Sequence, residues 1–215
     1  IAGGGKILLS GDLRRKAFKA DLVGGKVNLK AEGLVGPFEN SLDEQIDHIL
    51  IKGHALNLAE FVSSAPQTDL DFDATIVPSP QKGLALEGSI DLTNSLAAPA
   101  DQNGIPVRSI LGEFTVGDSG ILKVHDVTAT LLEEGALILG GETDTDKNTF
   151  ALEAILKNAS LSDFVSQKYD DVFEGSLLLN GTYREPQAKW DIRGNRASST
   201  GELAIANDTT NGQRS

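Results

Sequence analysis

The 215-residue chain has no cysteine, no methionine and few aromatic residues, namely eight Phe, two Tyr and one Trp. Without thiols it is neither a disulfide scaffold nor a Cys-ligated metal protein, and the absence is compatible with an oxidising compartment such as a periplasm. No apolar run approaches the roughly 18 to 20 residues of a membrane span. Because the chain begins at Ile1 and holds no methionine, we expect a segment of a longer polypeptide.

Positive charge is also scarce, since 19 Lys and Arg stand against 31 Asp and Glu, for a formal net charge of −12. No block of basic residues offsets this charge locally, so we expect no nucleic-acid partner. An anionic bilayer surface is disfavoured for the same reason. The apolar share of 40% and the charged share of 23% are those of an ordinary folded domain, so disorder of the whole chain is not expected.

What the chain has in abundance is a period-two alternation of apolar and polar residues. In TDLDFDATI (68–76) every second residue is apolar, and the residues between are Asp or Thr. On a pleated strand this spacing puts the apolar groups on one face and the polar groups on the other. The same alternation recurs in KVNLKAEGLV (26–35), LALEGSIDL (84–92), FALEAIL (150–156), FEGSLLLNGTY (173–183) and AKWDIRG (188–194).

Turn signals separate these runs at the 8 to 12 residue spacing of an antiparallel meander. They are Gly24-Gly25, Gly36-Pro37, Pro78-Ser79-Pro80, Asn103-Gly104, Gly117-Asp118, Glu134-Gly135, Lys147-Asn148 and Glu185-Pro186. About a dozen strands are predicted. No sharp domain boundary interrupts them, so we expect residues 1–205 to form a single segment and the polar residues 206–215 to form a frayed tail.

Two short segments are predicted to be helical turns, because each places an acidic residue three positions after an N-cap. They begin at Asn57 and at Ser160. The sequences that follow, LAEFVS (58–63) and LSDFVS (161–166), match at an offset of 103 residues. Each lies between two alternating strands, which indicates a β architecture extended unit by unit.

A dozen strands with one apolar face must bury it by closing into a barrel, by forming a sandwich, or by curving around something that is not protein. The apolar set consists mainly of Leu, Ile, Val, Ala and Gly, which line a surface smoothly but fill a wide interior poorly. Glycines at 33, 88, 140, 175 and 181 are expected to bend the sheet or leave room beside it. A filled sandwich and an open, curved sheet explain the alternation equally well.

Motifs for catalysis or metal binding are incomplete. Gly117-Asp-Ser-Gly120 resembles a protease nucleophile loop, but no histidine stands in a matching context, so a turn is predicted. Asp144-Thr-Asp146-Lys-Asn148 opens like a calcium loop but lacks the later glycine and carboxylate, and is interpreted as a hairpin turn. His48 and His54, near Glu44 and Asp47, match no zinc spacing, and His125 is interpreted as structural. We expect neither an enzyme nor a bound metal or cofactor.

Three passages resemble a known family. Residues 84–142 carry a strand of the form L-x-G-x-I-x-L-x-N, a small-Pro loop, an Ile-Pro segment and a Gly-rich strand. Residues 159–194 carry a helical turn and a G-x-L-x-L-x-G-T-x-x-x-P hairpin, and residues 19–39 a simpler hairpin of the same kind. These patterns are similar to the repeating units of the TamB family, the inner-membrane subunits of the translocation and assembly module, within the AsmA-like superfamily.

The resemblance implies an all-β fold, a curved and incompletely closed antiparallel sheet that forms a hydrophobic groove, called a β-taco. It also implies a periplasmic location within a protein that an outside helix anchors in the inner membrane. Implied partners are phospholipid acyl chains, a TamA-like outer-membrane barrel of the Omp85 type and unfolded outer-membrane protein clients. The implied roles are phospholipid transport between the two membranes and the assembly of outer-membrane proteins and autotransporters.

The aliphatic strand positions are the candidate groove lining, because burying acyl chains needs apolar contact and no specific polar group. We predict that the lining includes Leu70, Phe72, Ile76, Leu84, Leu86, Ile90, Leu92, Leu152, Leu177 and Leu179. Two other functions remain open. One is a chaperone-like module that lends strand edges or an apolar surface to unfolded outer-membrane β-strands. The other is an adhesin or structural β-repeat with a self-filled core.

Overall fold

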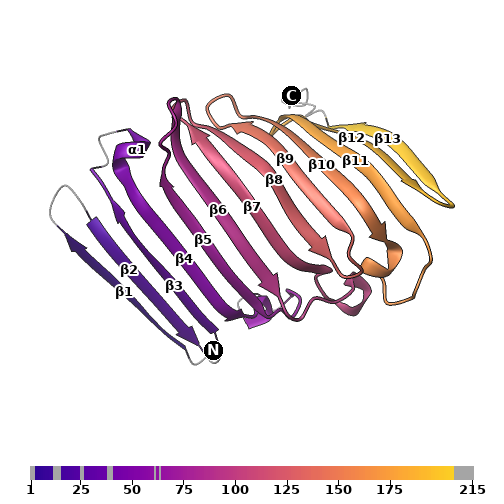
Figure 1. Cartoon of the computed structure of the whole chain (residues 1–215), viewed down its shortest axis with the longest axis horizontal. Helices are drawn as coiled ribbons and strands as arrows, with labels where there is room; N and C mark the ends of the chain where they lie inside the picture. Colours follow the sequence, from indigo (N-terminus) through magenta and orange to yellow (C-terminus); the bar gives the residue numbers. More distant parts are fainter. Residues whose placement is uncertain are drawn as a thin grey trace, which may run out of the picture.

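A computed structural model describes residues 3–11, 16–24, 27–37, 41–60, 62 and 64–205. Within them, thirteen strands form one sheet, in which each strand pairs antiparallel with the next along the chain (Figure 1). The strands are β1 (Gly3–Gly11), β2 (Lys16–Gly24), β3 (Val27–Val35), β4 (Ile46–Leu56), β5 (Leu70–Pro78), β6 (Leu84–Asn94), β7 (Val107–Gly117), β8 (Ile121–Leu131), β9 (Ala136–Asp144), β10 (Thr149–Ser160), β11 (Val172–Thr182), β12 (Pro186–Gly194) and β13 (Ser198–Ala204).

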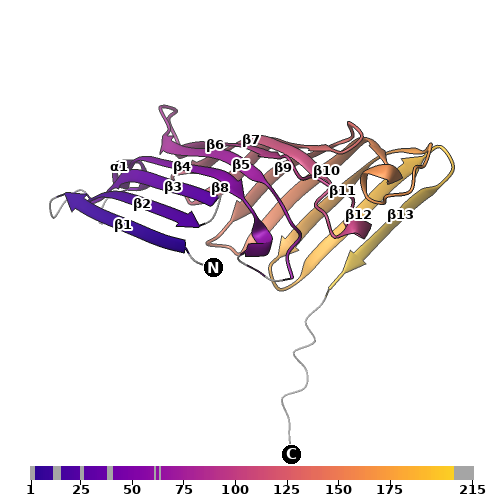
Figure 2. The same cartoon turned by 90° about the horizontal axis from the view of Figure 1, so that it is seen from below.

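The sheet is open, because β1 and β13 lie at opposite ends of its long axis (Figure 1). Figure 2 shows it twisted and arched, with the middle strands above both edges. The predicted all-β, curved and incompletely closed sheet is therefore confirmed, and the filled sandwich is not formed. Each turn signal within the described residues lies between consecutive strands, as predicted.

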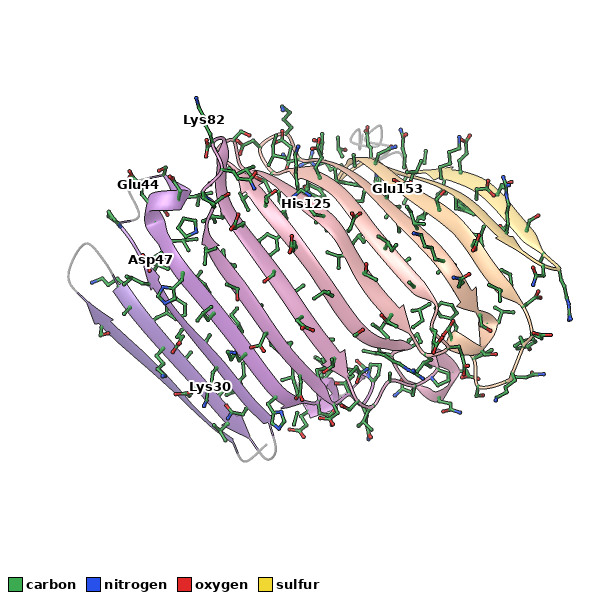
Figure 3. All side chains as sticks on the ribbon, in the orientation of Figure 1. Lys30, Glu44, Asp47, Lys82, His125 and Glu153 are labelled. Carbon is green, nitrogen blue, oxygen red and sulfur yellow. The ribbon has the colours of Figure 1, made fainter. Side chains whose placement is uncertain are left out.

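Strand register carries the apolar alternation across the whole sheet. Phe72 lies opposite Gly53 on one side and Leu92 on the other. Leu177 likewise lies between Ala154 and Trp190. Because directly opposed residues share a face, these rows define one apolar face, on the inner side of the arch. Polar side chains such as Lys30, His125 and Glu153 lie on the opposite, outer face, which is turned to the viewer in Figure 3.

In the part of the chain that the structure describes, no second layer covers the apolar face. Among the described residues, only five apolar side chains are buried: Leu70, Ala85, Leu86, Leu131 and Ala159. The accessible surface of the chain is 14082 Å². A compact monomer of this mass exposes roughly 9,500 Å². The excess follows from the single-layer architecture, in which most aliphatic side chains are shielded only by neighbours on their own face.

Aromatic rings lie flat on glycines of neighbouring strands. A Cβ at Gly53 would lie 2.1 Å from the ring of Phe72, and one at Gly88 would lie 2.3 Å from the ring of Phe114. Phe18 occupies the same place over Gly33, Phe173 over Gly194 and Trp190 over Gly201. These rings cover backbone that glycine leaves bare, an arrangement that stabilises strand register. They also keep the apolar face smooth, because a ring that lies flat does not project from it.

Gly140 and Gly175, for which the sequence predicts the same role, differ in the space around them. A Cβ on Gly175 would lie 2.3 Å from the carbonyl oxygen of Asp191 and 2.7 Å from the Cα of Ile192, both backbone atoms of β12. A Cβ on Gly140 would meet nothing nearer than 3.8 Å. The prediction that glycines leave room beside the sheet therefore describes Gly140, whereas Gly175 is needed for close approach of two strands.

This difference predicts unequal effects of alanine. We expect Gly175→Ala to lower the free energy of unfolding by about 2 kcal/mol, because the β11 and β12 backbones must separate. Gly140→Ala is the matched control and should change it by less than about 0.5 kcal/mol. Urea titrations followed by circular dichroism measure both. Equal effects of the two substitutions would contradict the register of β11 against β12.

Short helical turns lie in three connections and before β4. The predicted turns are present as η1 (Leu58–Glu60) and η3 (Leu161–Asp163), each between two strands. The Ser160 side chain accepts a hydrogen bond from the Ser162 amide, and the Asp163 carboxylate accepts one from the Ser160 amide. The sequence did not predict α1 (Leu42–Gln45) or η2 (Ala100–Gln102). The similar segments follow β4 and β10, so the 103-residue offset spans six strands and preserves strand direction.

The predicted polar tail, residues 206–215, lies outside the described residues. Within the part of the chain that the structure describes, no helix is long and apolar enough to cross a membrane.

Candidate apolar binding face

Seven of the ten predicted lining residues lie in the open rows of the apolar face. Phe72, Ile76, Ile90 and Leu92 come from β5 and β6, where Phe72 lies opposite Leu92. Leu152, Leu177 and Leu179 come from β10 and β11, where Leu152 lies opposite Leu179. All seven side chains are half-buried, so each presents apolar surface that no described residue covers.

The other three predicted residues are placed differently. Leu70 and Leu86 are on the apolar face but are 8% and 5% exposed, so they contribute packing and little open surface. Leu84 pairs with Gly117, whereas Leu86 pairs with Val116, because an irregularity at Ala85 shifts the register. This shift turns Leu84 toward the polar face, where it lines a shallow depression with Glu87, Ser89 and Lys123. A bulge of this kind reverses the facing of all residues beyond it.

One border of the sheet is covered by long connections. We call it the loop border; it comprises residues 57–60, 62, 64–69, 95–106, 132–135, 161–171 and 195–197, and it runs along the bottom of Figure 1. In Figure 2 the long loops lie beneath the arch, over the end of the apolar face. Three of the five buried apolar residues, Leu70, Leu131 and Ala159, lie at this border. The loops therefore close one side of the face.

Two of these loops are joined although they follow strands four positions apart. The Asp101 carboxylate accepts hydrogen bonds from the Ser166 amide at 2.9 Å and the Ser166 hydroxyl at 2.7 Å. The Ala100 amide donates to the Phe164 carbonyl at 2.8 Å. The hydrogen bonds from Ser166 lower the pKa of the Asp101 carboxyl. Together they hold the loop after β6 against the loop after β10, across the ends of the strands between them.

The opposite border carries shorter connections between β7 and β12. We call the residues 118–120, 145–148 and 183–185 the turn border. Gly117-Asp-Ser-Gly120 joins β7 to β8, as predicted, with Gly120 at a φ of +76°. In the next turn the Asp144 carboxylate accepts hydrogen bonds from the Lys147 amide and ammonium groups, which lowers the Asp144 pKa. The predicted interpretation of 144–148 as a polar hairpin turn is thus confirmed.

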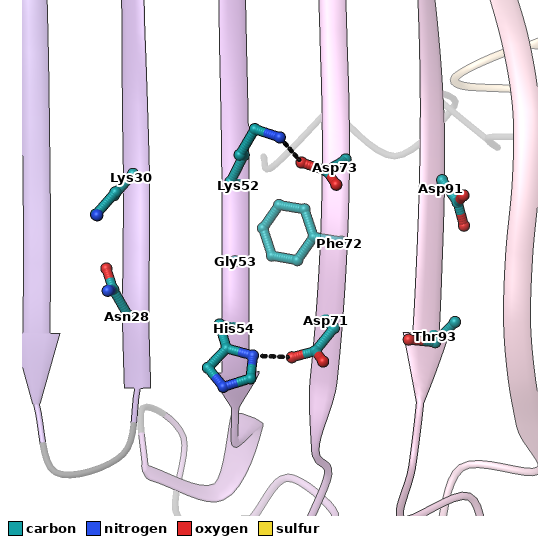
Figure 4. Close-up of a pocket in the computed structure, with 10 residues that line it drawn as sticks. All are labelled: Asn28, Lys30, Lys52, Gly53, His54, Asp71, Phe72, Asp73, Asp91 and Thr93. Atoms are coloured by element: carbon teal, nitrogen blue, oxygen red, sulfur yellow. Dashed lines mark ion pairs between the residues drawn. The ribbon is translucent and has the colours of Figure 1, made fainter.

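The polar face carries cross-strand ion pairs, shown in Figure 4. Lys52 Nζ lies 2.8 Å from Asp73, and His54 Nδ1 lies 2.7 Å from Asp71. The hydrogen bond to Asp73 raises the pKa of Lys52. Because these side chains are mostly exposed, the pairs contribute little to stability. These charged groups keep the outer face hydrated. The apolar face is therefore the side of the sheet that would gain free energy by binding a nonpolar partner.

The histidines lie on strands, as predicted. His48 and His54 are on β4, beside Asp47 and Asp71 respectively, and His125 on β8 lies 2.8 Å from the Thr115 hydroxyl. Among the described residues, no group of three or more His, Asp or Glu side chains is arranged to hold a metal ion.

Sequence reasoning missed a cluster at the turn border. The ring of Tyr183 stacks on Phe150 with a centroid distance of 5.7 Å, and its hydroxyl lies 2.5 Å from the Thr143 hydroxyl. Thr143 lies opposite Phe150 on the apolar face. Tyr183 follows the last residue of β11, and the alternation predicts only that it ends the apolar row of that strand. The usable signal was composition, since it is one of two tyrosines in an aliphatic chain.

Comparisons with protein-family models, curated proteins and solved structures find no match for this chain. The fold itself defines the class of this protein, which is a single-layer antiparallel meander with one open apolar face. The resemblance to TamB-family units stays a prediction drawn from Gly, Leu and Pro patterns.

Proposed function

We propose that this chain is a lipid-binding segment, in which the apolar face holds acyl chains. The observation that carries the proposal is the open aliphatic face, which extends from β2 to β12 without a covering layer. Exposed apolar patches of this extent on a folded chain mark interaction surfaces. A lipid chain is the occupant that best fits a continuous face whose central rows carry no charge.

The energetics favour such a ligand. Complete burial of a methylene group contributes about 0.8 kcal/mol. A chain lying on one face of a sheet loses water on one side only, so about half of this value applies. A long acyl chain still gains several kcal/mol without any specific contact. The net charge of −12 does not oppose this binding, because the central rows of the apolar face carry no charged residue and charged side chains such as Lys30 and Glu153 lie on the outer face.

The resemblance extends the proposal to a cellular role. As part of a TamB-like protein, the segment would conduct phospholipid between the inner and outer membranes, within the periplasm, and work with a TamA-like barrel. The six-strand offset between the η1 and η3 regions supports a conduit built from repeating units, because an even number of strands lets each unit continue the sheet in the same direction.

The single tryptophan provides a direct test. Trp190 lies on the apolar face, directly opposite Leu177. Phospholipids brominated along the acyl chain should quench its fluorescence, whereas the water-soluble headgroup alone should not. Mass spectrometry of the purified protein should also detect bound phospholipid or detergent. Unchanged Trp190 fluorescence, together with a lipid-free protein, would overturn the proposal.

A second candidate is favoured by the two sheet edges, since β1 and β13 each pair with one strand only. Open edges accept an added strand through backbone hydrogen bonds, as a chaperone for unfolded outer-membrane β-strands would require. Crosslinking a strand peptide from positions in β13 separates the two functions. Strand addition uses the backbone of the edge and should not respond to substitutions in the centre of the apolar face.

A further inference from the structure

The two borders of the apolar face differ in how far their connections cover it. At the loop border, Leu131 and Ala159 are buried beneath the loops and Asp163 is fully buried. The exposed charged side chains there are mainly acidic: Glu60, Asp101, Glu133, Glu134 and Asp170, with Lys168 and Arg196 as the basic ones. At the turn border between β7 and β12, the three connections have only three or four residues each, which is too few to fold over the ends of the apolar rows. A lipid lying along the strands therefore meets the loops at one end and solvent at the other.

Tyr183 lies at this open side. Its side chain is 55% exposed, yet one ring face stacks on Phe150, whose own side chain belongs to the apolar face. A ring with an apolar body and a polar tip is suited to the boundary between acyl chains and headgroups. The other tyrosine, Tyr169, is 43% exposed at the loop border, where its hydroxyl donates to the Gln167 side chain.

The hydrogen bonds around Tyr183 bear on whether its hydroxyl can donate or accept a hydrogen bond from a ligand. The Thr143 hydroxyl has one proton and can donate it to the Thr149 carbonyl at 3.2 Å. Either hydroxyl can donate in the 2.5 Å contact between Thr143 and Tyr183. When Thr143 donates to the Thr149 carbonyl, Tyr183 is the donor in that contact, and its phenolic oxygen keeps lone pairs but has no proton left to give. A ligand that bonds to it must then bring an N–H or O–H group.

We infer that Tyr183, supported by Thr143 and Phe150, holds the polar end of the lipid at the turn border, and that it recognises a hydrogen-bond donor there. Two headgroup chemistries meet this requirement, the ammonium of ethanolamine and the hydroxyls of glycerol, whereas choline carries neither donor. The inference rests on the proposed function, since it assigns the orientation and headgroup class of a ligand on the same face. The acidic chain favours the ammonium of the two.

The test uses short-chain phospholipids below their micelle concentrations, with identical acyl chains and ethanolamine, glycerol or choline headgroups. Binding is followed by the fluorescence of Trp190. We expect the ethanolamine lipid to bind about threefold more tightly than the choline lipid, as one added hydrogen bond predicts. Equal affinity of the glycerol and ethanolamine lipids would assign recognition to a hydroxyl as well. A glycerol lipid that binds like the choline lipid would assign it to the ammonium.

Tyr183→Phe keeps the stacked ring and removes the oxygen, so it should bring the ethanolamine-to-choline affinity ratio to about 1. Tyr169→Phe, the matched control at the loop border, should leave the ratio unchanged. A wild-type ratio of 1, or a ratio that Tyr183→Phe does not alter, would overturn the inference while the acyl-binding function stands. If none of the three lipids binds, the proposed function itself fails.

Discussion

Leu177→Arg should reduce the affinity for acyl chains by more than tenfold, with the sheet still formed. Leu177 lies in the centre of β11 on the apolar face, between Ala154 of β10 and Trp190 of β12. A guanidinium group at this position would have to lose its hydration wherever an acyl chain covers it, at a cost of several kcal/mol. Without lipid, the same group remains in water, because no layer formed by the described residues covers this face. Binding should therefore suffer far more than folding.

The adjacent residue supplies the control. Leu178 is on the polar face, 40% exposed, where it lies opposite Glu153 and Lys189. Leu178→Arg introduces the same side chain one residue away and should leave lipid binding within about twofold of wild type. Ile90→Arg on β6 repeats the test in the other half of the apolar face. Lipid retained by each variant is quantified by mass spectrometry, because Trp190 is too close to position 177 to report without bias.

The outcome also separates the two candidate functions. If Leu177→Arg and Leu178→Arg lower lipid binding equally, the facing of the strands is not what matters and the apolar face is not the binding surface. If neither arginine changes the crosslinking of a strand peptide to β13, strand addition and lipid binding are independent properties of the sheet. Thermal unfolding of all three variants checks that a loss of binding is not a loss of fold.

The fold was predictable because period two is a local and strongly constrained signal. Every alternating residue on β5 follows directly from TDLDFDATI, and each turn signal within the described residues stands at a real connection. Whether the apolar face would be covered was not predictable from alternation, since a sandwich and an open sheet require the same pattern. The curvature is a cumulative effect of twist and bulges over thirteen strands, to which each residue contributes little.

The sequence predicts that the candidate face is aliphatic, but it does not predict the placement of every residue in it. Leu84 has the correct spacing to share a face with Leu86, but the bulge at Ala85 reverses it, and no residue type in that stretch announces the bulge. Leu70 has the correct face, but it is only 8% exposed at the loop border, and alternation along one strand does not indicate that burial. Tyr183 and Thr143 are forty residues apart and meet through strand register, which local patterns do not specify.

The largest loss of stability is expected from Asp163→Ala at the loop border. Asp163 is fully buried, and its two carboxylate oxygens accept hydrogen bonds from the backbone amides of Glu133 and Ser160. It thereby ties the β8–β9 connection to the start of η3. Alanine leaves both amides without partners in a site that water does not reach, and each such loss costs about 1 to 3 kcal/mol. We expect the free energy of unfolding to fall by about 3 kcal/mol, measured by urea titration.

Asp101→Ala is the comparison within the same border, because that carboxylate also accepts two hydrogen bonds but is exposed, so water replaces its partners. It should cost less than about 1 kcal/mol. Hydrogen exchange gives the second readout: the Glu133 and Ser160 amides should lose protection in Asp163→Ala and keep it in Asp101→Ala. A cost for Asp163→Ala no greater than that for Asp101→Ala would mean that the loops do not close this side of the apolar face as a packed unit. The loop border would then be as open to lipid as the turn border, and the orientation assigned through Tyr183 would lose its structural basis.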